Sequence, residues 1–259
     1  MFRHALRRPV SMRHAFALAF DLTMLRDPWH SLIVPFLLRA PWIAAGMVMT
    51  SRSGRSTPGL VLGLAIVTIG GSVTSWEVDA MLRFRARSVF NTPHGVPPAP
   101  ALECYRRGLR RLPWLYVTEL TRNLALFVAF PALFLPGLYL GYKLAFATEA
   151  VVLNDRNLAG AIEHSFHLAR GRFERWFEMV AGSVLIVLAF WFVAALVYAI
   201  PSRPPSLPII LAGFSLLLIA LLPVFQYAWT FFYLRLVEVE EPQIQEAGPF
   251  FATGGMAGR

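Results

Sequence analysis

The stretch FEMVAGSVLIVLAFWFVAALVYAI, residues 177–200, is apolar on every side of a helix and carries one charge, Glu178. A helix of a soluble protein rarely exceeds about 20 residues and normally keeps a polar face. A bilayer core of about 30 Å is instead crossed by about 20 apolar residues rising about 1.5 Å each. This stretch therefore predicts a membrane-spanning helix.

The composition of the whole chain points the same way. Of 259 residues, 56% are hydrophobic and 15% are charged, and the mean hydropathy is +0.55, whereas soluble domains carry roughly 25% charge. We predict an all-α polytopic membrane protein with six transmembrane helices in three hairpins, forming a domain over residues 1–236. Residues 237–259 are predicted to form a partly disordered cytoplasmic tail. The predicted spans are residues 29–50, 58–77, 114–135, 137–153, 177–200 and 207–234.

The arginines indicate the orientation and the partners. They collect before the first predicted span, between the second and third, and between the fourth and fifth. Cytoplasmic flanks of membrane helices are enriched in basic residues, so we expect both termini in the cytoplasm. The net charge of +9 then reflects attraction to anionic lipids, and we expect no nucleic acid as a partner.

A short basic segment precedes each predicted hairpin: SMRHAFALAFDLTMLRDPW (11–29), ALECYRRGLRRLPW (101–114) and AGAIEHSFHLARGRFERW (159–176). Such segments are typical of amphipathic helices in the membrane interface, with arginines toward phosphate and tryptophan at headgroup depth. A threefold internal repeat and ordinary basic loops both explain the pattern. The residues expected at anionic headgroups are Arg106, Arg107, Arg110, Arg111, Arg170 and Arg172.

Residues 135–177, LPGLYLGYKLAFATEAVVLNDRNLAGAIEHSFHLARGRFERWF, carry a resemblance that is clearest over residues 110–195. It rests on Pro136, Gly137, Lys143, Glu149, Ala161, Ser165, Leu168 and Gly171. The stretch resembles the integral membrane domain found beside glycerophosphodiester phosphodiesterases and in stand-alone, YciC-like bacterial membrane proteins. The resemblance implies a helical fold in the bacterial inner membrane. It brings no catalytic residue, because the phosphodiesterase chemistry of those relatives belongs to a separate soluble barrel of about 250 residues.

Four of the charged residues in the predicted spans lie deep inside them: Arg39, Glu119, Arg122 and Glu149. With a rise of about 1.5 Å per residue, Arg39 and Arg122 lie roughly 12–15 Å below the cytoplasmic face, and Glu149 reaches a similar level. A charge at that depth normally finds a partner. We predict a charged layer in which Glu149 pairs with Arg122, whereas Asp79 is expected at the interface. Such a layer can be architectural, bind lipid or substrate, or couple protons or ions.

Lys143 is the only lysine of the chain and lies six residues after Gly137. At about 9 Å from the outer turn it can reach the headgroups by snorkelling, and a lipid phosphate is its expected partner. His164 and His167 share a helix face, but two histidines do not complete a metal site. Cys104 is the only cysteine, so we expect no disulfide, metal or other cofactor.

The sequence contains no signature motif for nucleotide binding or hydrolysis. We therefore expect a non-catalytic inner-membrane protein, an accessory or scaffold subunit that organises lipid or a partner membrane complex. The alternative is a small transporter or lipid-handling protein in which the charged layer lines a cavity. A membrane-embedded enzyme would need acidic or histidine clusters at the interface, which the sequence supplies only sparsely.

Overall fold

The computed structural model describes residues 12–51, 57–92, 99–132, 134–199 and 207–246, and every regular element in these ranges is a helix. Two of the elements, η1 and η2, are short π-helical segments. The elements are α2 (Met12–Phe20), η1 (Asp21–Arg26), η2 (Trp29–Ile33), α3 (Val34–Ser51), α4 (Thr57–Asn91), α5 (Ala101–Ala132), α6 (Phe134–Lys143), α7 (Ala147–Leu153), α8 (Leu158–Leu168), α9 (Phe173–Ala199) and α10 (Leu207–Glu246).

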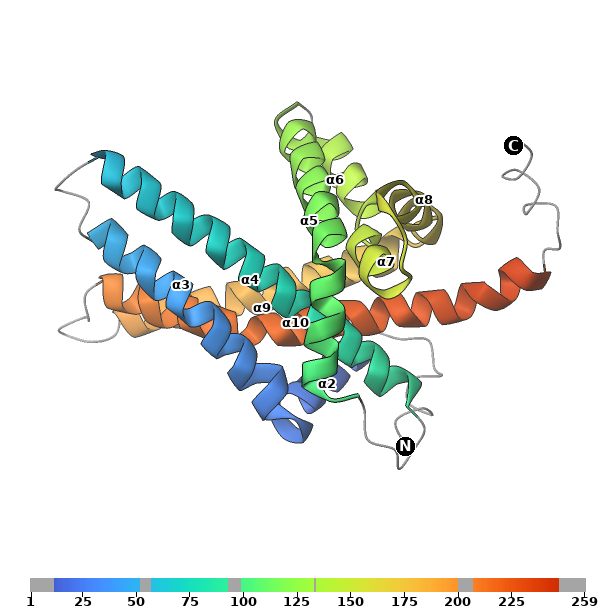
Figure 1. The fold of residues 1–259 in the computed structure, drawn as a ribbon, viewed down its shortest axis with the longest axis horizontal. Coiled ribbons are helices and arrows are strands. Elements are labelled where there is room, and N and C mark those ends of the chain that lie inside the picture. The colour runs from blue at the N-terminus through green and yellow to red at the C-terminus, as the bar shows by residue number, and fades with distance from the viewer. Residues whose placement is uncertain (1–11, 52–56, 93–98, 133, 200–206, 247–259) are drawn as a thin grey trace.

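Three helices of the described chain are long and apolar enough to cross a membrane. The crossing segments are Val61–Asn91 in α4, Phe173–Val193 in α9 and Leu217–Glu238 in α10. The helical membrane fold predicted from the sequence is confirmed at this level, but six spans are not supported. In Figure 1, α10 runs along the whole molecule, and the α3–α4 and α9–α10 hairpins extend toward the same end.

The remaining predicted spans differ from the structure in instructive ways. Residues 29–50 begin with the π-helical segment η2 before α3 starts at Val34. Residues 114–135 are not preceded by a separate interfacial helix, because α5 runs without interruption from Ala101 through Pro113. Pro136 and Gly137, predicted to form a turn, both lie inside α6. A Cβ at Gly137 would approach the Phe130 ring to 2.8 Å, so this glycine lets α6 lie close to α5.

The predicted span 137–153 is broken by a turn at residues 144–146, between α6 and α7. The buried hydroxyl of Ser165, on α8, donates to the carbonyl of Lys143 at 2.7 Å and accepts from the N–H of Phe146 at 3.0 Å. These are backbone groups that a continuous helix would pair internally and that are costly to leave unpaired when buried. One side chain from α8 therefore stabilises the break, and α7 changes direction.

The first predicted interfacial segment is packed into the protein instead of lying alone on the bilayer. Its helix α2 lies against α10, with Ala15 and Ala19 completely buried and the rings of Phe16 and Phe225 5.9 Å apart. Small residues on this face allow the two helix backbones to approach closely. At the other end of the chain, residues 237–246 of the predicted tail continue α10, and residues 247–259 lie outside the described ranges.

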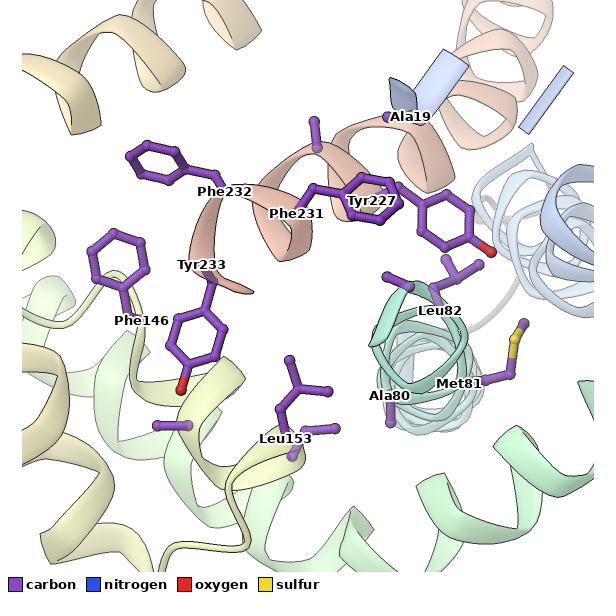
Figure 2. Packing of buried hydrophobic residues seen from close by; sticks show 14 of the residues in the cluster. Ala19, Ala80, Met81, Leu82, Phe146, Leu153, Tyr227, Phe231, Phe232 and Tyr233 are labelled. Carbon is purple, nitrogen blue, oxygen red and sulfur yellow. The ribbon is translucent and has the colours of Figure 1, made fainter. Parts of the chain in front are cut away.

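Aromatic side chains of α10 form the centre of the core and position α7. Figure 2 shows Phe146 beside Tyr233, with Leu153 below them, and the two rings are 6.1 Å apart. The buried Tyr233 hydroxyl donates to Asn154 Oδ1 at 2.8 Å, which satisfies the polar end of an otherwise apolar side chain. Tyr233 thus contacts the residues just before and just after α7, and these contacts fix the orientation of Thr148 and Glu149 within it.

Candidate functional site: a charged pocket between the helices

The first part of the site is an ion pair between α3 and α4. Nη2 of Arg39 lies 2.5 Å from Oδ1 of Asp79, and Nε of Arg39 donates to Ser75 Oγ at 3.2 Å. Only 4% of the Arg39 side chain is exposed. Asp79, which was not among the residues predicted for the charged layer, therefore belongs to it through Arg39.

The second part corrects the pairing predicted for Glu149. Oε1 of Glu149 lies 3.2 Å from Nε of Arg83, on α4. Arg122 pairs instead with Glu119, one turn earlier on α5, at 2.7 Å. Thr148 links the two pairs, because its hydroxyl donates to Glu149 Oε2 at 3.0 Å and accepts from Arg122 Nη1 at 3.4 Å. The predicted direct contact between Arg122 and Glu149 is thus replaced by an indirect one.

The charged residues form a continuous layer because Asp79 and Arg83 are one turn apart on α4 and face the same side. Asp79 extends the layer toward Arg39 on α3, and Arg83 extends it toward Glu149 on α7. Each guanidinium is matched by a carboxylate, and a buried charge is tolerated only when it is paired and hydrogen-bonded. Asp79 and Arg83, which were not predicted for the layer, thus connect Arg39 to Glu149.

A pocket of about 470 Å³ opens over this layer. Its floor is charged, since it contains Asp79, Arg83, Glu119, Arg122 and Glu149. Its walls are mostly apolar and come from four helices, α5, α6, α9 and α10, through Leu126, Phe130, Leu138, Gly141, Trp176, Val180, Gln226 and Trp229. A concave site with apolar walls and a few convergent polar groups is the usual form of a small-molecule site.

Aromatic residues stiffen one wall of this charged pocket. The ring of Trp176, which lines the pocket, lies 5.4 Å from the ring of Tyr142 behind it, and both side chains are buried. The Tyr142 hydroxyl accepts from the backbone N–H of Arg172 at 3.1 Å. This bond ties the start of α9 to α6 and fixes the wall next to Trp176.

Lys143 lies outside the charged pocket in an aromatic setting. Its ammonium is 5.4 Å from the ring centre of Tyr139, 5.3 Å from that of Tyr142 and 6.0 Å from that of Phe166. A cation within about 6 Å of aromatic faces is stabilised by their quadrupoles. This explains how a lysine is tolerated in so apolar a segment, and its contact with a lipid phosphate stays a prediction.

The basic residues predicted at headgroups occupy two regions. Arg106, Arg107, Arg110 and Arg111 lie on the first part of α5, whereas Arg170 and Arg172 lie between α8 and α9. Several of them have protein partners. Arg107 pairs with Glu103 at 2.5 Å, Arg111 pairs with Asp155, and Arg172 donates to the Leu168 carbonyl at 2.9 Å.

His164 and His167 lie on α8 without further metal-ligating neighbours. Across the described ranges, no three side chains among His, Cys, Asp and Glu are grouped so that they could hold a metal ion. Burial lowers the pKa of His164 to about 4, and the positive charges of Arg156 and His167 act in the same direction. His164 is therefore neutral at physiological pH, beside Tyr233 with the ring centres 6.3 Å apart.

Sequence reasoning missed Arg83 and Asp79 because it ended the second span at residue 77. The sequence that follows, VDAMLRFRARSVFN, contains neither proline nor glycine. Nothing in it stops the helix, and α4 continues to Asn91. In a helix that continues past residue 77, residues 79 and 83 lie on one face. This spacing was the sequence signal for their shared role.

The comparisons with known proteins concern the second half of the chain. No curated protein and no solved structure matches it. One segment, which runs from the middle of α5 into α10, does match a known domain family. It includes Glu119, Arg122, Thr148 and Glu149, whereas Asp79 and Arg83 precede it. Over residues 113–236 the chain contains a domain of unknown function (DUF7847).

Proposed function

We propose that this chain is a non-catalytic membrane protein that binds a lipid or a lipid-like amphiphile in the charged pocket. In this role it acts as an accessory or scaffold subunit that organises lipid around itself or around a partner membrane complex. The observation that carries the proposal is the combination of a charged floor with apolar walls in one pocket of about 470 Å³. An amphiphile likewise combines a charged or polar headgroup with an apolar part.

The charges of the lining favour a zwitterionic headgroup. Asp79, Glu119 and Glu149 contribute carboxylates, and Arg83 and Arg122 contribute guanidiniums. A headgroup that carries a phosphate and an amine can donate to a carboxylate and accept from a guanidinium at once. Of the two lining arginines, Arg122 is the more accessible, with 27% of its side chain exposed against 5% for Arg83. We expect the phosphate at Arg122.

The surroundings of the pocket support access from the bilayer. On α5, the side chains of Leu124, Phe127 and Val128 are each at least 60% exposed, and large exposed apolar surfaces mark membrane or protein contacts. We propose that α3 and the apolar parts of α5 and α6 lie in the membrane beside the three candidate spans. Within the same proposal, the membrane is the bacterial inner membrane and both termini are cytoplasmic.

The resemblance to the membrane domain found beside glycerophosphodiester phosphodiesterases, and to YciC-like proteins, fits this proposal. Of the residues that carry it, Ser165 stabilises the break before α7, and Glu149 lies in the charged floor. A shared pattern at these positions is explained if the bent α6–α7 element and its charged pocket are what such domains have in common.

The proposal is tested by filling the pocket without changing its charges. Gly141 lines the pocket, and a Cβ there would meet only Leu126, at 3.6 Å. Gly141→Leu therefore adds bulk to the pocket, whereas Gly213→Leu is the matched control on α10, where a Cβ meets nothing within 4 Å. After purification in mild detergent, native mass spectrometry should show a phosphatidylethanolamine retained by the wild type and by Gly213→Leu and lost by Gly141→Leu. Equal retention by all three proteins would contradict the proposal.

A transporter is the second candidate, and the broken α6–α7 element favours it because discontinuous helices line the substrate sites of many transporters. The two candidates differ in water access. In a Cys104→Ser background, Ala145→Cys places a thiol in the pocket lining. A transporter should react with a membrane-impermeant maleimide from both sides of the membrane, and a static lipid site from neither.

A further inference from the structure

We propose that the chain has a second binding site, at the polar end of α4, which takes a phosphate group. The site is a cavity of about 670 Å³ between the end of α4, the first part of α5 and the turn after α7. Arg87, Arg107, Arg110 and Arg111 line it. Asp155 is the only acidic residue among its described lining residues.

The arginines are held in different ways, and they outnumber their carboxylate partners. Arg111 pairs with Asp155, and Arg107 pairs with Glu103 at 2.5 Å. Arg87 donates to the backbone carbonyl of Leu153, which carries no charge. The Arg110 side chain has neither an ion pair nor a hydrogen bond to any residue that the structure describes. Two of four guanidiniums therefore face the cavity without a carboxylate.

The backbone after α7 places the acidic wall of the cavity. Asp155 has a φ of 55°, in the left-handed region that Asp and Asn adopt more readily than most residues. Its carboxylate pairs with Arg111 of α5. Two residues earlier, the Leu153 carbonyl accepts from Arg87 of α4, so one stretch of chain holds arginines from two helices.

Guanidiniums that approach from two helices suit a phosphate better than a single carboxylate. Phosphate presents three oxygens and up to two charges, and arginine binds such oxygens with two parallel N–H bonds. The other described lining residues are Phe84, Ser88, Asn91, Thr92, Ala99 and Cys104. A cavity of this volume is large enough for a phosphorylated small molecule or a phospholipid headgroup, because ligand sites measure roughly 300–1,000 Å³.

This site is independent of the charged pocket described above. Among the residues that the structure describes, none lines both cavities. In the charged pocket, three carboxylates face two guanidiniums, whereas here four guanidiniums face one carboxylate. The inference therefore goes beyond the proposed function, and a failure of one leaves the other standing.

The experiment uses the full chain in nanodiscs and has two arms that separate the sources of phosphate. In phosphatidylcholine nanodiscs, inorganic pyrophosphate is titrated by isothermal calorimetry. In the second arm, nanodiscs contain phosphatidic acid mixed with phosphatidylcholine, and native mass spectrometry of the ejected protein measures how much phosphatidic acid remains bound. Saturation in the first arm identifies a soluble phosphate, and selective retention in the second arm alone identifies a lipid headgroup.

The variants distinguish a defined site from general attraction to a basic surface. Arg110→Gln and Arg87→Gln should each weaken binding by about tenfold or more, because each removes a charged donor to the anion. Arg106→Gln is the matched control, since Arg106 is exposed on the same helix and does not line the cavity. It should change binding less than twofold. Asp155→Asn keeps a residue suited to the left-handed backbone, removes the opposing charge and should tighten binding.

Two results would overturn the site. One is the absence of saturable binding by the wild type in both arms. The other is a loss in Arg106→Gln as large as that in Arg110→Gln, which would mean diffuse electrostatic attraction. Misfolding does not obscure the result, because the Arg110 side chain is exposed and makes no ion pair or hydrogen bond to the described residues. The thermal unfolding curve of its variant should therefore match the wild type.

Discussion

Nε of Arg83 lies 3.2 Å from Oε1 of Glu149, and only 5% of either side chain is exposed. This pair joins α4 to the short helix α7 across 66 residues of sequence. Because burying one of these charges without the other is costly, the pair stabilises α7, with Thr148 and Glu149, over the floor of the charged pocket.

The first prediction concerns the loss of one partner of this pair. Glu149→Gln leaves the Arg83 guanidinium buried without a counter-charge, and we expect the free energy of unfolding to fall by about 3–5 kcal/mol. The double variant Arg83→Met/Glu149→Leu should lose less, because no unpaired charge remains. Unfolding in mixed detergent and denaturant, followed by circular dichroism, measures both. Glu178→Gln, which breaks an exposed pair with Arg175, is the control and should cost at most about 1 kcal/mol.

The second prediction concerns the turn between α6 and α7. Ser165→Ala removes the bonds to the Lys143 carbonyl and the Phe146 N–H, and we expect a loss of about 1–3 kcal/mol of stability. Ser183→Ala is matched in chemistry but removes only a bond to the Met179 carbonyl within α9, and it should cost less than Ser165→Ala. Equal losses in the two variants would show that the Ser165 bonds do not stabilise the break.

The third prediction is a pH dependence that originates in His164. Its pKa in the folded protein is lowered to about 4, whereas an unfolded chain has a histidine pKa of about 6.5. Between these values the unfolded state binds a proton that the folded state does not, so stability decreases as the pH falls from about 6.5 to about 4. His164→Gln should flatten that part of the curve of melting temperature against pH. His14→Gln, an exposed histidine on α2, should leave it in place.

The membrane class and all three candidate spans were predictable from local sequence, although the predicted span 58–77 ended too early in α4. Residues 177–200 and 207–234 are apolar enough to identify α9 and much of α10 without any tertiary information. That charges such as Arg39 and Glu149 have buried partners was also predictable, because a buried charge needs a partner whatever the topology.

What sequence reasoning could not supply were the contacts between distant segments. In the sequence, the predicted span 137–153 looks continuous. Its break is stabilised by the hydroxyl of Ser165, which lies on a later helix. For the same reason the partner of Glu149 was misidentified, because depth along a helix does not tell which helix lies opposite. The predicted number of spans was not supported either, because counting apolar runs treats the segments of α5 and α6 as equivalent to α9.

The central claim, that an amphiphile lies in the charged pocket, is tested most directly by photo-crosslinking. A phosphatidylethanolamine with a photoactivatable acyl chain is reconstituted with the full chain, illuminated and mapped by peptide mass spectrometry. We predict that adducts concentrate on residues 126–141 of α5 and α6, at the pocket wall that contains Leu126, Phe130 and Leu138, and that Gly141→Leu removes them. Adducts spread evenly over exposed apolar residues of α9, such as Leu185 and Phe192, and unchanged in Gly141→Leu, would contradict the claim.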